Sequence, residues 1–174
     1  MQTIYTIGHS TRTTEQFLAL LKAHGIEELV DVRTIPRSRH NPQFGTEELA
    51  ASLQQAGIAY THFGKLGGLR HASKDSVNLG WQNTSFRGFA DYMATPEFQT
   101  GLEELKALAE EKTVTIMCAE AVPWRCHRSL IADALTIQGW LVLHIQSRKT
   151  ASPHKLTQFL NAQDGKITYP ASEE

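Results

Sequence analysis

The chain has 174 residues, of which 41% are hydrophobic and 20% are charged, and its formal net charge at pH 7 is −1. These values are typical of a single globular domain with a substantial core. A net charge near zero excludes a global attraction to nucleic acid or to an anionic membrane, so any anion binding must come from local clusters. We find no apolar run long enough to span a bilayer and no signal-peptide pattern. The two cysteines lie beside ionisable groups, which favours reduced thiols and a cytoplasmic location.

Short β-rich runs alternate with helical patterns along most of the chain. The first helix is predicted by the capping box Thr13-x-x-Gln16, and Gly25 ends it. Later helices are predicted after the caps Thr46 and Thr95, and another begins near Cys126. Two shorter helices are expected at Phe86–Met93 and Ser152–Phe159. The expected strands are Thr3–Ile7, Glu28–Val32, Ile58–Phe63, Val114–Met117 and Trp140–Ile145.

Strands separated by helices predict a mostly parallel sheet with helices on both faces. We therefore expect an α/β fold, with one three-layer domain over residues 1–165 and about five strands. The strand order 3-2-1-4-5 is taken only from the general preference of doubly wound folds. Residues 166–174 are expected to form a flexible tail. The glycine-rich stretch 64–85 has no helical or strand period, and a loop of this length in a small domain is typically functional or mobile.

The stretch Met117–Arg128 contains both cysteines of the chain, Cys118 and Cys126, together with Glu120 and His127. A buried strand is expected to end at the first cysteine, and a helix to begin near the second. Ligands of open α/β sheets bind where the carboxyl ends of strands face the N-termini of helices. The sequence therefore predicts that this loop is the floor of an active or binding site.

Polar residues also follow the other predicted strands. His9 and Ser10 follow the first strand, and Asp31 and Arg33 end the second. Parallel strands place their carboxyl ends at one edge of the sheet, so these side chains are expected to converge with the cysteines. The concentration of cations at this edge favours an anionic ligand such as a phosphate, nucleotide, carboxylate or sulfur oxyanion. Further cationic or histidine side chains on the neighbouring loops are Arg37, Arg39, His40, Lys65, Arg70, His71, Arg125, His127 and Arg128.

Roles follow from the chemistry of each residue type. Cys118 or Cys126 is expected to be a nucleophile or redox thiol, because a helix N-terminus and nearby cations lower a thiol pKa. The other expected catalytic residues are His9, Asp31, Glu120 and His127. The expected ligand-binding residues are Ser10, Arg33, Arg37, Ser38, Gly67, Gly68 and Arg128.

Each group also has a structural alternative. Asp31 and Arg33 could form an ion pair only, and Cys118 could be a buried strand-end residue. The arginine of a tyrosine-phosphatase loop follows its cysteine by six positions, but here those positions hold Trp124 and Ala132. A likeness to rhodanese rests only on the tripeptide Asp31-Val32-Arg33.

A metal site is a less favoured alternative, because the chain contains no Cys-x-x-Cys pair and the adjacent Cys126 and His127 point in different directions from a helix. A disulfide between Cys118 and Cys126 is less favoured still, although it could form on oxidation. The cofactor is left open. The ligands considered for zinc or iron are Cys118, Cys126, His127 and His9.

Several short motifs occur together in one order along the chain. They are Gly8-His9-Ser10, Asp31-Val32-Arg33 with Pro36-x-Ser38, Leu66-Gly67-Gly68, Met117-Cys118-Ala119-Glu120 with Cys126-His127-Arg128, and Val142-Leu143-His144-Ile145. In this combination, from about Ile7 to Ile145, the chain resembles the family called domain of unknown function 488. The resemblance implies a small bacterial or archaeal cytoplasmic α/β domain, and it supplies no substrate.

Our leading hypothesis is an enzyme or enzyme-like domain that acts on an anionic, phosphate- or nucleotide-like ligand. The alternative is a non-catalytic module that binds nucleic acid or a nucleotide through Lys65–Trp81 and Arg37–His40. A third possibility is a partner-binding domain that uses the long loop as its interface. The sequence predicts no membrane partner and leaves the oligomeric state open.

Overall fold

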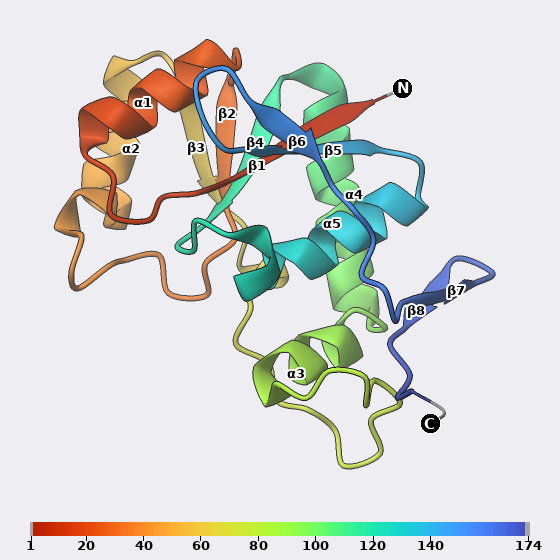
Figure 1. The fold of residues 1–174 in the computed structure, drawn as a ribbon. Coiled ribbons are helices and arrows are strands. Elements are labelled where there is room, and N and C mark those ends of the chain that lie inside the picture. The colour runs from red at the N-terminus through yellow and green to blue at the C-terminus, as the bar shows by residue number, and fades with distance from the viewer. Residues whose placement is uncertain (1, 173–174) are drawn as a thin grey trace.

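The computed structural model describes residues 2–172, which form a three-layer α/β domain around a six-stranded sheet (Figure 1). Five strands are parallel and the sixth is antiparallel, so the predicted α/β class is confirmed. The strands of this sheet are β1 (Thr3–Gly8), β2 (Glu28–Asp31), β3 (Ala59–His62), β4 (Val114–Cys118), β5 (Leu141–Ile145) and β6 (Ala151–Pro153). The helices are α1 (Thr14–Ala23), α2 (Thr46–Gln55), α3 (Thr84–Tyr92), α4 (Pro96–Glu111) and α5 (Arg128–Ile137). None of these helices combines the length and apolar character needed to cross a membrane.

The helix starts follow the capping signals with one exception. Both hydrogen bonds of the Thr13–Gln16 capping box are present, and the Thr95 side chain accepts a hydrogen bond from the Phe98 amide. Thr46 was expected to cap α2 but is its first residue, and Gly45 takes the cap position. The Thr46 hydroxyl instead donates to the carbonyl oxygen of Pro36 at 2.6 Å and so ties the proline-containing loop to α2.

The strand order is β3-β2-β4-β1-β5-β6, so the expected order 3-2-1-4-5 is wrong at the centre of the sheet. Strand β4, and not β1, pairs with β2. Strand β4 therefore lies between β2 and β1, and all five of its residues are buried, whereas β1 has half-buried positions at Thr3 and Tyr5. As a result, Cys118 at the end of β4 lies between the segments that follow β1 and β2. The amide of His9 donates to the Cys118 carbonyl oxygen, and the amide of Val32 donates to that of Met117.

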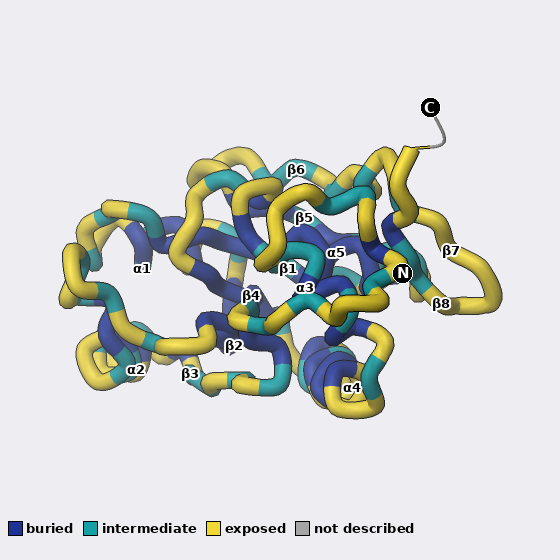
Figure 2. The backbone as a smooth tube through the Cα atoms, turned by 90° about the horizontal axis from the view of Figure 1, so that it is seen from below, coloured by how far each residue is buried: buried dark blue, intermediate teal, exposed yellow. Residues whose placement is uncertain are grey.

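Side chains alternate between the two faces of the sheet and form two separate cores. Helices α1 and α2 cover one face and α4 and α5 cover the other, as Figure 1 shows. In Figure 2 the buried backbone lies in the central strands and α5, and the exposed backbone lies in the outer loops. Ile116 and Cys118 face the α4/α5 core, while Met117 faces the α1/α2 core. In β2, Val30 faces the α4/α5 core, so the adjacent Asp31 points to the opposite layer.

The segment after β5 departs furthest from the sequence prediction. The helix expected at Ser152–Phe159 is wrong, because Ala151–Pro153 forms β6 along the edge of β5 and residues 154–159 are not helical. A Ser-Pro pair is an acceptable helix start, but here pairing with an open sheet edge prevails over that local signal.

Residues 166–172, expected in the flexible tail, contain an ordered strand and a buried tyrosine. The small strands β7 (Asn161–Gln163) and β8 (Lys166–Thr168) form a hairpin. Tyr169 follows it, and its hydroxyl donates to Asp133 on α5 at 2.8 Å. Residues 173–174 of the expected tail lie outside the described residues.

Candidate functional site

A fully buried arginine lies under the cysteine loop. Arg128, the first residue of α5, donates from Nη1 to the Cys118 sulfur at 2.9 Å and to the carbonyl oxygen of Glu120. Its Nη2 donates to the carbonyl oxygen of Ala121 at 3.0 Å. No carboxylate within residues 2–172 forms an ion pair with Arg128. A buried guanidinium keeps its proton and needs a nearby anion, and the sulfur of Cys118 is placed to be that anion.

The two thiols share this environment but differ in their acidity. Burial raises the pKa of Cys118, but a hydrogen bond from Cys126 and the positive charge of Arg128 outweigh burial and lower that pKa to about 7. Burial, together with the adjacent Cys118 sulfur, raises the pKa of Cys126 well above its ordinary value. Both cysteines are reduced. Cys118 is therefore the more acidic thiol of the pair.

Gly8 allows the cysteine loop to approach β1. A Cβ atom at this position would lie 1.6 Å from the Glu120 carbonyl oxygen and 2.7 Å from the Arg128 guanidinium. The amide of Ser10 donates to the carbonyl oxygen of Ala119, which continues the contact between the two chain segments beyond their strands. Position 8 therefore requires glycine, because the backbone of the cysteine loop leaves no room there for a Cβ atom.

His127 is a neutral part of the wall beside the thiols. Its Nε2–H donates to the carbonyl oxygens of Val32 and Leu66, both at 3.0 Å, which leaves Nδ1 unprotonated and 3.6 Å from the Cys126 sulfur. Burial lowers the pKa of His127 to about 4, because a buried imidazolium is poorly solvated. Near pH 7 this ring can accept a proton on its cysteine side but has none to donate there.

The glycine pair of the Leu66-Gly67-Gly68 motif serves close packing. A Cβ on Gly68 would lie 2.6 Å from Nδ1 of His127, and a Cβ on Gly67 would lie 2.8 Å from the Thr34 hydroxyl. The Thr34 hydroxyl also accepts a hydrogen bond from the Leu69 amide. These contacts bring the long loop against the cysteine loop, so both glycines have a structural role whether or not they touch a ligand.

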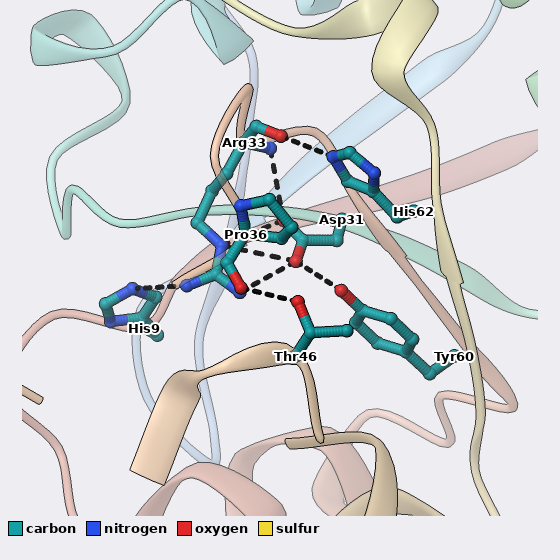
Figure 3. Close-up of polar contacts among 7 residues, drawn as sticks. All are labelled: His9, Asp31, Arg33, Pro36, Thr46, Tyr60 and His62. Carbon is teal, nitrogen blue, oxygen red and sulfur yellow. Dashed lines mark hydrogen bonds and ion pairs between the residues drawn. The ribbon is translucent and has the colours of Figure 1, made fainter. Parts of the chain in front are cut away.

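On the opposite layer of the sheet, Asp31 and Arg33 form a buried ion pair (Figure 3). Arg33 donates from Nη2 to Asp31 at 2.7 Å and from Nε to both carboxylate oxygens, at 2.9 and 3.2 Å. The Tyr60 hydroxyl donates to the same carboxylate at 2.7 Å, and burial, followed by this hydrogen bond, raises the pKa of Tyr60 to about 12. The imidazole Nε2 of His62 donates to the Arg33 carbonyl oxygen at 2.6 Å. The charge of Arg33 is therefore matched within the protein.

His9 belongs to the Arg33 cluster and not to the thiol pair. Its Nδ1–H donates to the carbonyl oxygen of Ser10 at 2.8 Å, and its Nε2 lies 3.4 Å from Nη1 of Arg33. The ring stacks on Phe44 at a centroid distance of 4.4 Å. Burial is the main cause that lowers the pKa of His9, so this histidine is neutral near pH 7. Ser10 has a positive φ of 50° and turns the chain away from the sheet.

A cavity of about 360 Å³ opens beside the two thiols. Its apolar wall includes the exposed side chains of Ile35 and Leu69, which are 51% and 66% accessible, and the partly buried Phe86. Its exposed cations are Arg37 and Arg125. The predicted site residues that line it are Arg33, Arg37, Gly68, Cys118, Glu120, Cys126 and His127. The predicted residues outside its lining are His9, Ser10, Asp31, Ser38, Gly67 and Arg128.

The apolar wall is the part of the cavity that sequence reasoning missed. Leu69 lies in the stretch without a period, and Phe86 was assigned only to a helix. Large apolar side chains in a loop that has no core-facing pattern were the available signal. Ser38 has a local role, because its hydroxyl accepts a hydrogen bond from the Asn41 amide.

The basic residues of the long loop make intramolecular contacts. Lys65 pairs with Glu104 at 2.8 Å, and the Arg70 guanidinium lies 3.6 Å from the centre of the Tyr92 ring. Trp81 packs edge-on against Phe86, with ring centroids 5.2 Å apart. Within residues 2–172, no group of three or more His, Cys, Asp or Glu side chains has the arrangement of a metal site.

A second polar network fixes the far side of α5. Asp133 accepts hydrogen bonds from His154 and Thr157, both at 2.7 Å, and from Tyr169. His154 also lies 2.8 Å from His144 on β5. This network joins the segment after β5 to the same helix that carries Arg128 at its N-terminus.

Comparison with known families gives one match. Residues 13–135 match the family described as Domain of unknown function DUF488, and this range includes Asp31, Arg33, both cysteines and Arg128. The comparisons with curated proteins and with solved structures gave no match. Because the match covers more than half of the 174 residues, the chain belongs to the DUF488 family.

Proposed function

We propose that this protein is an enzyme in which the thiolate of Cys118 attacks a small anionic substrate bound in the cavity. The observation that carries the proposal is the pairing of Cys118 with Arg128, a fully buried arginine that has no carboxylate partner within residues 2–172. A thiolate is the reactive form of cysteine, and a neighbouring guanidinium makes it available near neutral pH. A cytoplasmic location, which we also propose, would keep both thiols reduced.

The charges around the cavity support an anionic substrate. Arg33 is matched by Asp31, and Arg128 by Cys118, so neither is free to bind a ligand as its main partner. Arg37 and Arg125 line the cavity, are exposed, and form no ion pair within residues 2–172. They are therefore the cations that would hold a phosphate, nucleotide or carboxylate group.

The cavity also suggests how protons would move. Glu120 is an exposed carboxylate at the cavity and could exchange a proton with a leaving group. His127 is neutral and presents an unprotonated Nδ1 toward Cys126, so it would serve as an acceptor only. The apolar wall formed by Ile35, Leu69 and Phe86 would contact an uncharged part of the substrate.

A nucleic-acid-binding module has less support. The cation and the aromatic residue that would form its contact face, Arg70 and Trp81, are engaged with Tyr92 and Phe86. Lys65 is paired with Glu104. Binding to an oligonucleotide that weakens steeply with salt and persists in Cys118→Ser would favour the module over the enzyme.

Alkylation with a matched pair of reagents tests the enzyme proposal. Iodoacetate is a small anionic electrophile, and iodoacetamide is its neutral counterpart. We expect Cys118 to be alkylated with a midpoint near pH 7, and the variants Arg37→Gln and Arg125→Gln to slow iodoacetate more than iodoacetamide. Peptide mass spectrometry would identify the modified cysteine. Alkylation of both cysteines only at the pH of an ordinary free thiol, with no preference between reagents, would refute the proposal.

A further inference from the structure

The two cysteines differ in a way that suggests consecutive roles. We infer that Cys126 is the resolving thiol for Cys118, and that the pair reduces a small disulfide that carries carboxylate groups. This inference rests on the proposed function, because it requires a reactive Cys118. It adds the class of substrate and assigns a role to the second cysteine.

The geometry places both sulfur atoms around one residue and one cavity. The Arg128 guanidinium donates to the Cys118 sulfur, and the Cys126 sulfur lies 3.6 Å from Nδ1 of His127, the residue before Arg128. Each thiol shifts the pKa of the other, so the two sulfur atoms are neighbours. Both residues line the same cavity. Cys126 has an extended backbone between the short 3-10 turn Pro123–Arg125 and α5, so it is not constrained by a regular helix or strand.

The reaction balances with the disulfide as the only oxidant. The thiolate of Cys118 forms a bond with one sulfur of the substrate, and the other sulfur leaves as a thiolate with the electron pair of the broken bond. The sulfur of Cys126 then bonds to the Cys118 sulfur, and the second substrate thiolate leaves and takes the proton of Cys126. The substrate gains two electrons and becomes one thiol and one thiolate, the thiolate takes a proton from water, and the protein is left with a Cys118–Cys126 disulfide.

The charge of Cys118 controls the order of these steps. In the reduced protein the Cys118 thiolate is one cause that raises the pKa of Cys126, so the second thiol stays protonated. When Cys118 is capped as a mixed disulfide, its negative charge is gone and Arg128 has lost its anion. Both changes favour ionisation of Cys126, which becomes reactive only after the substrate is attached.

The cavity accounts for the substrate class. A volume of about 360 Å³ is far larger than a hydroperoxide group requires, and it offers an apolar wall of Ile35, Leu69 and Phe86 for a soft sulfur and its carbon chain. Arg37 and Arg125 stand beside this wall and suit carboxylates, which accept paired hydrogen bonds from a guanidinium.

The full chain can be tested with 3,3′-dithiodipropionate, a dicarboxylate disulfide, and with 2-hydroxyethyl disulfide, its neutral counterpart. The reduced protein is mixed with each reagent at neutral pH without oxygen. Intact-mass spectrometry then follows the protein, and the released thiol is counted against time. We expect wild type to form an internal disulfide and release two small thiols per chain, whereas Cys126→Ser should stop at a stable adduct on Cys118 and release one. Arg37→Gln combined with Arg125→Gln should slow the dicarboxylate reagent about tenfold or more and leave the neutral one nearly unchanged.

The outcomes separate this inference from the proposed function. A stable adduct on Cys118 in wild type, at the same level as in Cys126→Ser, would overturn the resolving role and leave the nucleophile intact. Equal rates for the two reagents in wild type would overturn the carboxylate-bearing substrate. No thiol release from either protein would overturn both the inference and the proposed function. The Cys126→Ser variant keeps both Cys118 and Arg128, so the test can be made without disturbing the contact between them.

Discussion

Two buried arginines at the same edge of the sheet have different partners. Arg33 faces a carboxylate that it contacts through two nitrogen atoms, and Tyr60 donates to the same carboxylate. Arg128 faces a sulfur atom and two backbone carbonyls, and its Nε has no hydrogen-bond partner in the part of the chain that is described. Arg33 lines the cavity but its charge is matched by Asp31, whereas Arg128 lies outside the lining and its sulfur partner, Cys118, lies within it.

The Asp31 carboxylate and the Cys118 sulfur differ in their chemistry. The carboxylate of Asp31 is a poor nucleophile with its hydrogen-bonding capacity occupied, so its cluster suits a structural role. The sulfur of Cys118 is polarizable and lines the cavity, so an ion pair there would support the reactivity that we propose. Substitutions of the two anions, of Arg128 and of the tyrosine that donates to Asp31 can test this contrast.

The largest effect is expected from Asp31→Asn. This change leaves the buried Arg33 without a counter-charge, and breaking a buried pair in this way costs about 3–5 kcal/mol of unfolding free energy. Urea denaturation followed by circular dichroism would measure the loss. The exposed Asp75→Asn should change stability by less than about 0.5 kcal/mol and serves as a control. A loss below about 1 kcal/mol for Asp31→Asn would show that the two arginines do not differ as described.

The next effect is the dependence of stability on pH. The pKa of Cys118 is lower in the folded protein than in the unfolded chain, so the folded thiol loses its proton first and the free energy of unfolding should rise between pH 7 and 9 by at most about 2 kcal/mol. Above pH 9 the raised pKa of Cys126 has the opposite sign, because the unfolded thiol ionises first and stability falls. Urea denaturation at a series of pH values would record this profile. In Cys118→Ser the rise between pH 7 and 9 should disappear, and a rise that persists would assign it to other groups.

A somewhat smaller effect is expected from Arg128→Met, which keeps much of the side-chain volume and removes the charge. The thiol can then take up a proton, so its pKa should rise, and alkylation of Cys118 by iodoacetamide at pH 7 should slow by about tenfold or more. Arg125→Met is the matched control and should not change the rate with this neutral reagent. An unchanged alkylation midpoint in Arg128→Met would mean that the guanidinium does not set the thiol pKa.

The smallest effect is expected from Tyr60→Phe. It removes one hydrogen bond to Asp31 and leaves the ion pair with Arg33, so the loss of unfolding free energy should be about 1 kcal/mol. Thermal or urea unfolding is sufficient to measure it. A loss as large as that of Asp31→Asn would mean that the tyrosine, and not the arginine, dominates the cluster.

Much of the fold follows from local patterns in the sequence. The alternation of short apolar runs with capped helices predicts all five parallel strands and the five helices between them. The order of β1 and β4 could not be predicted, because it depends on pairing between strands that are far apart in the sequence, and local patterns do not record that pairing. The helix predicted at Ser152–Phe159 is wrong for a different reason, because Ala151–Pro153 pairs with the open edge of the preceding strand β5 and this pairing outweighs the local helix signal.

The sequence predicted which side chains lie at one edge of the sheet better than it predicted their contacts. Strand ends placed Cys118, His9 and Asp31 at one edge, but alternation along the strands sends Cys118 and Asp31 to opposite layers. The sulfur that Arg128 contacts lies ten positions earlier in the chain, and only side-chain geometry reveals this contact. Spacing cannot distinguish an arginine that binds a ligand from one that binds its own protein.

The network around Asp133 has a consequence for control from a distance. Helix α5 carries Arg128 at its first turn and is fixed further along by His154, Thr157 and Tyr169, which all lie beyond the residues that match the family. A small rotation of this helix would shift the guanidinium relative to both sulfur atoms. Substitutions near the C-terminal hairpin are therefore expected to tune thiol reactivity without touching the cavity, and a search for altered variants should include that region of the surface.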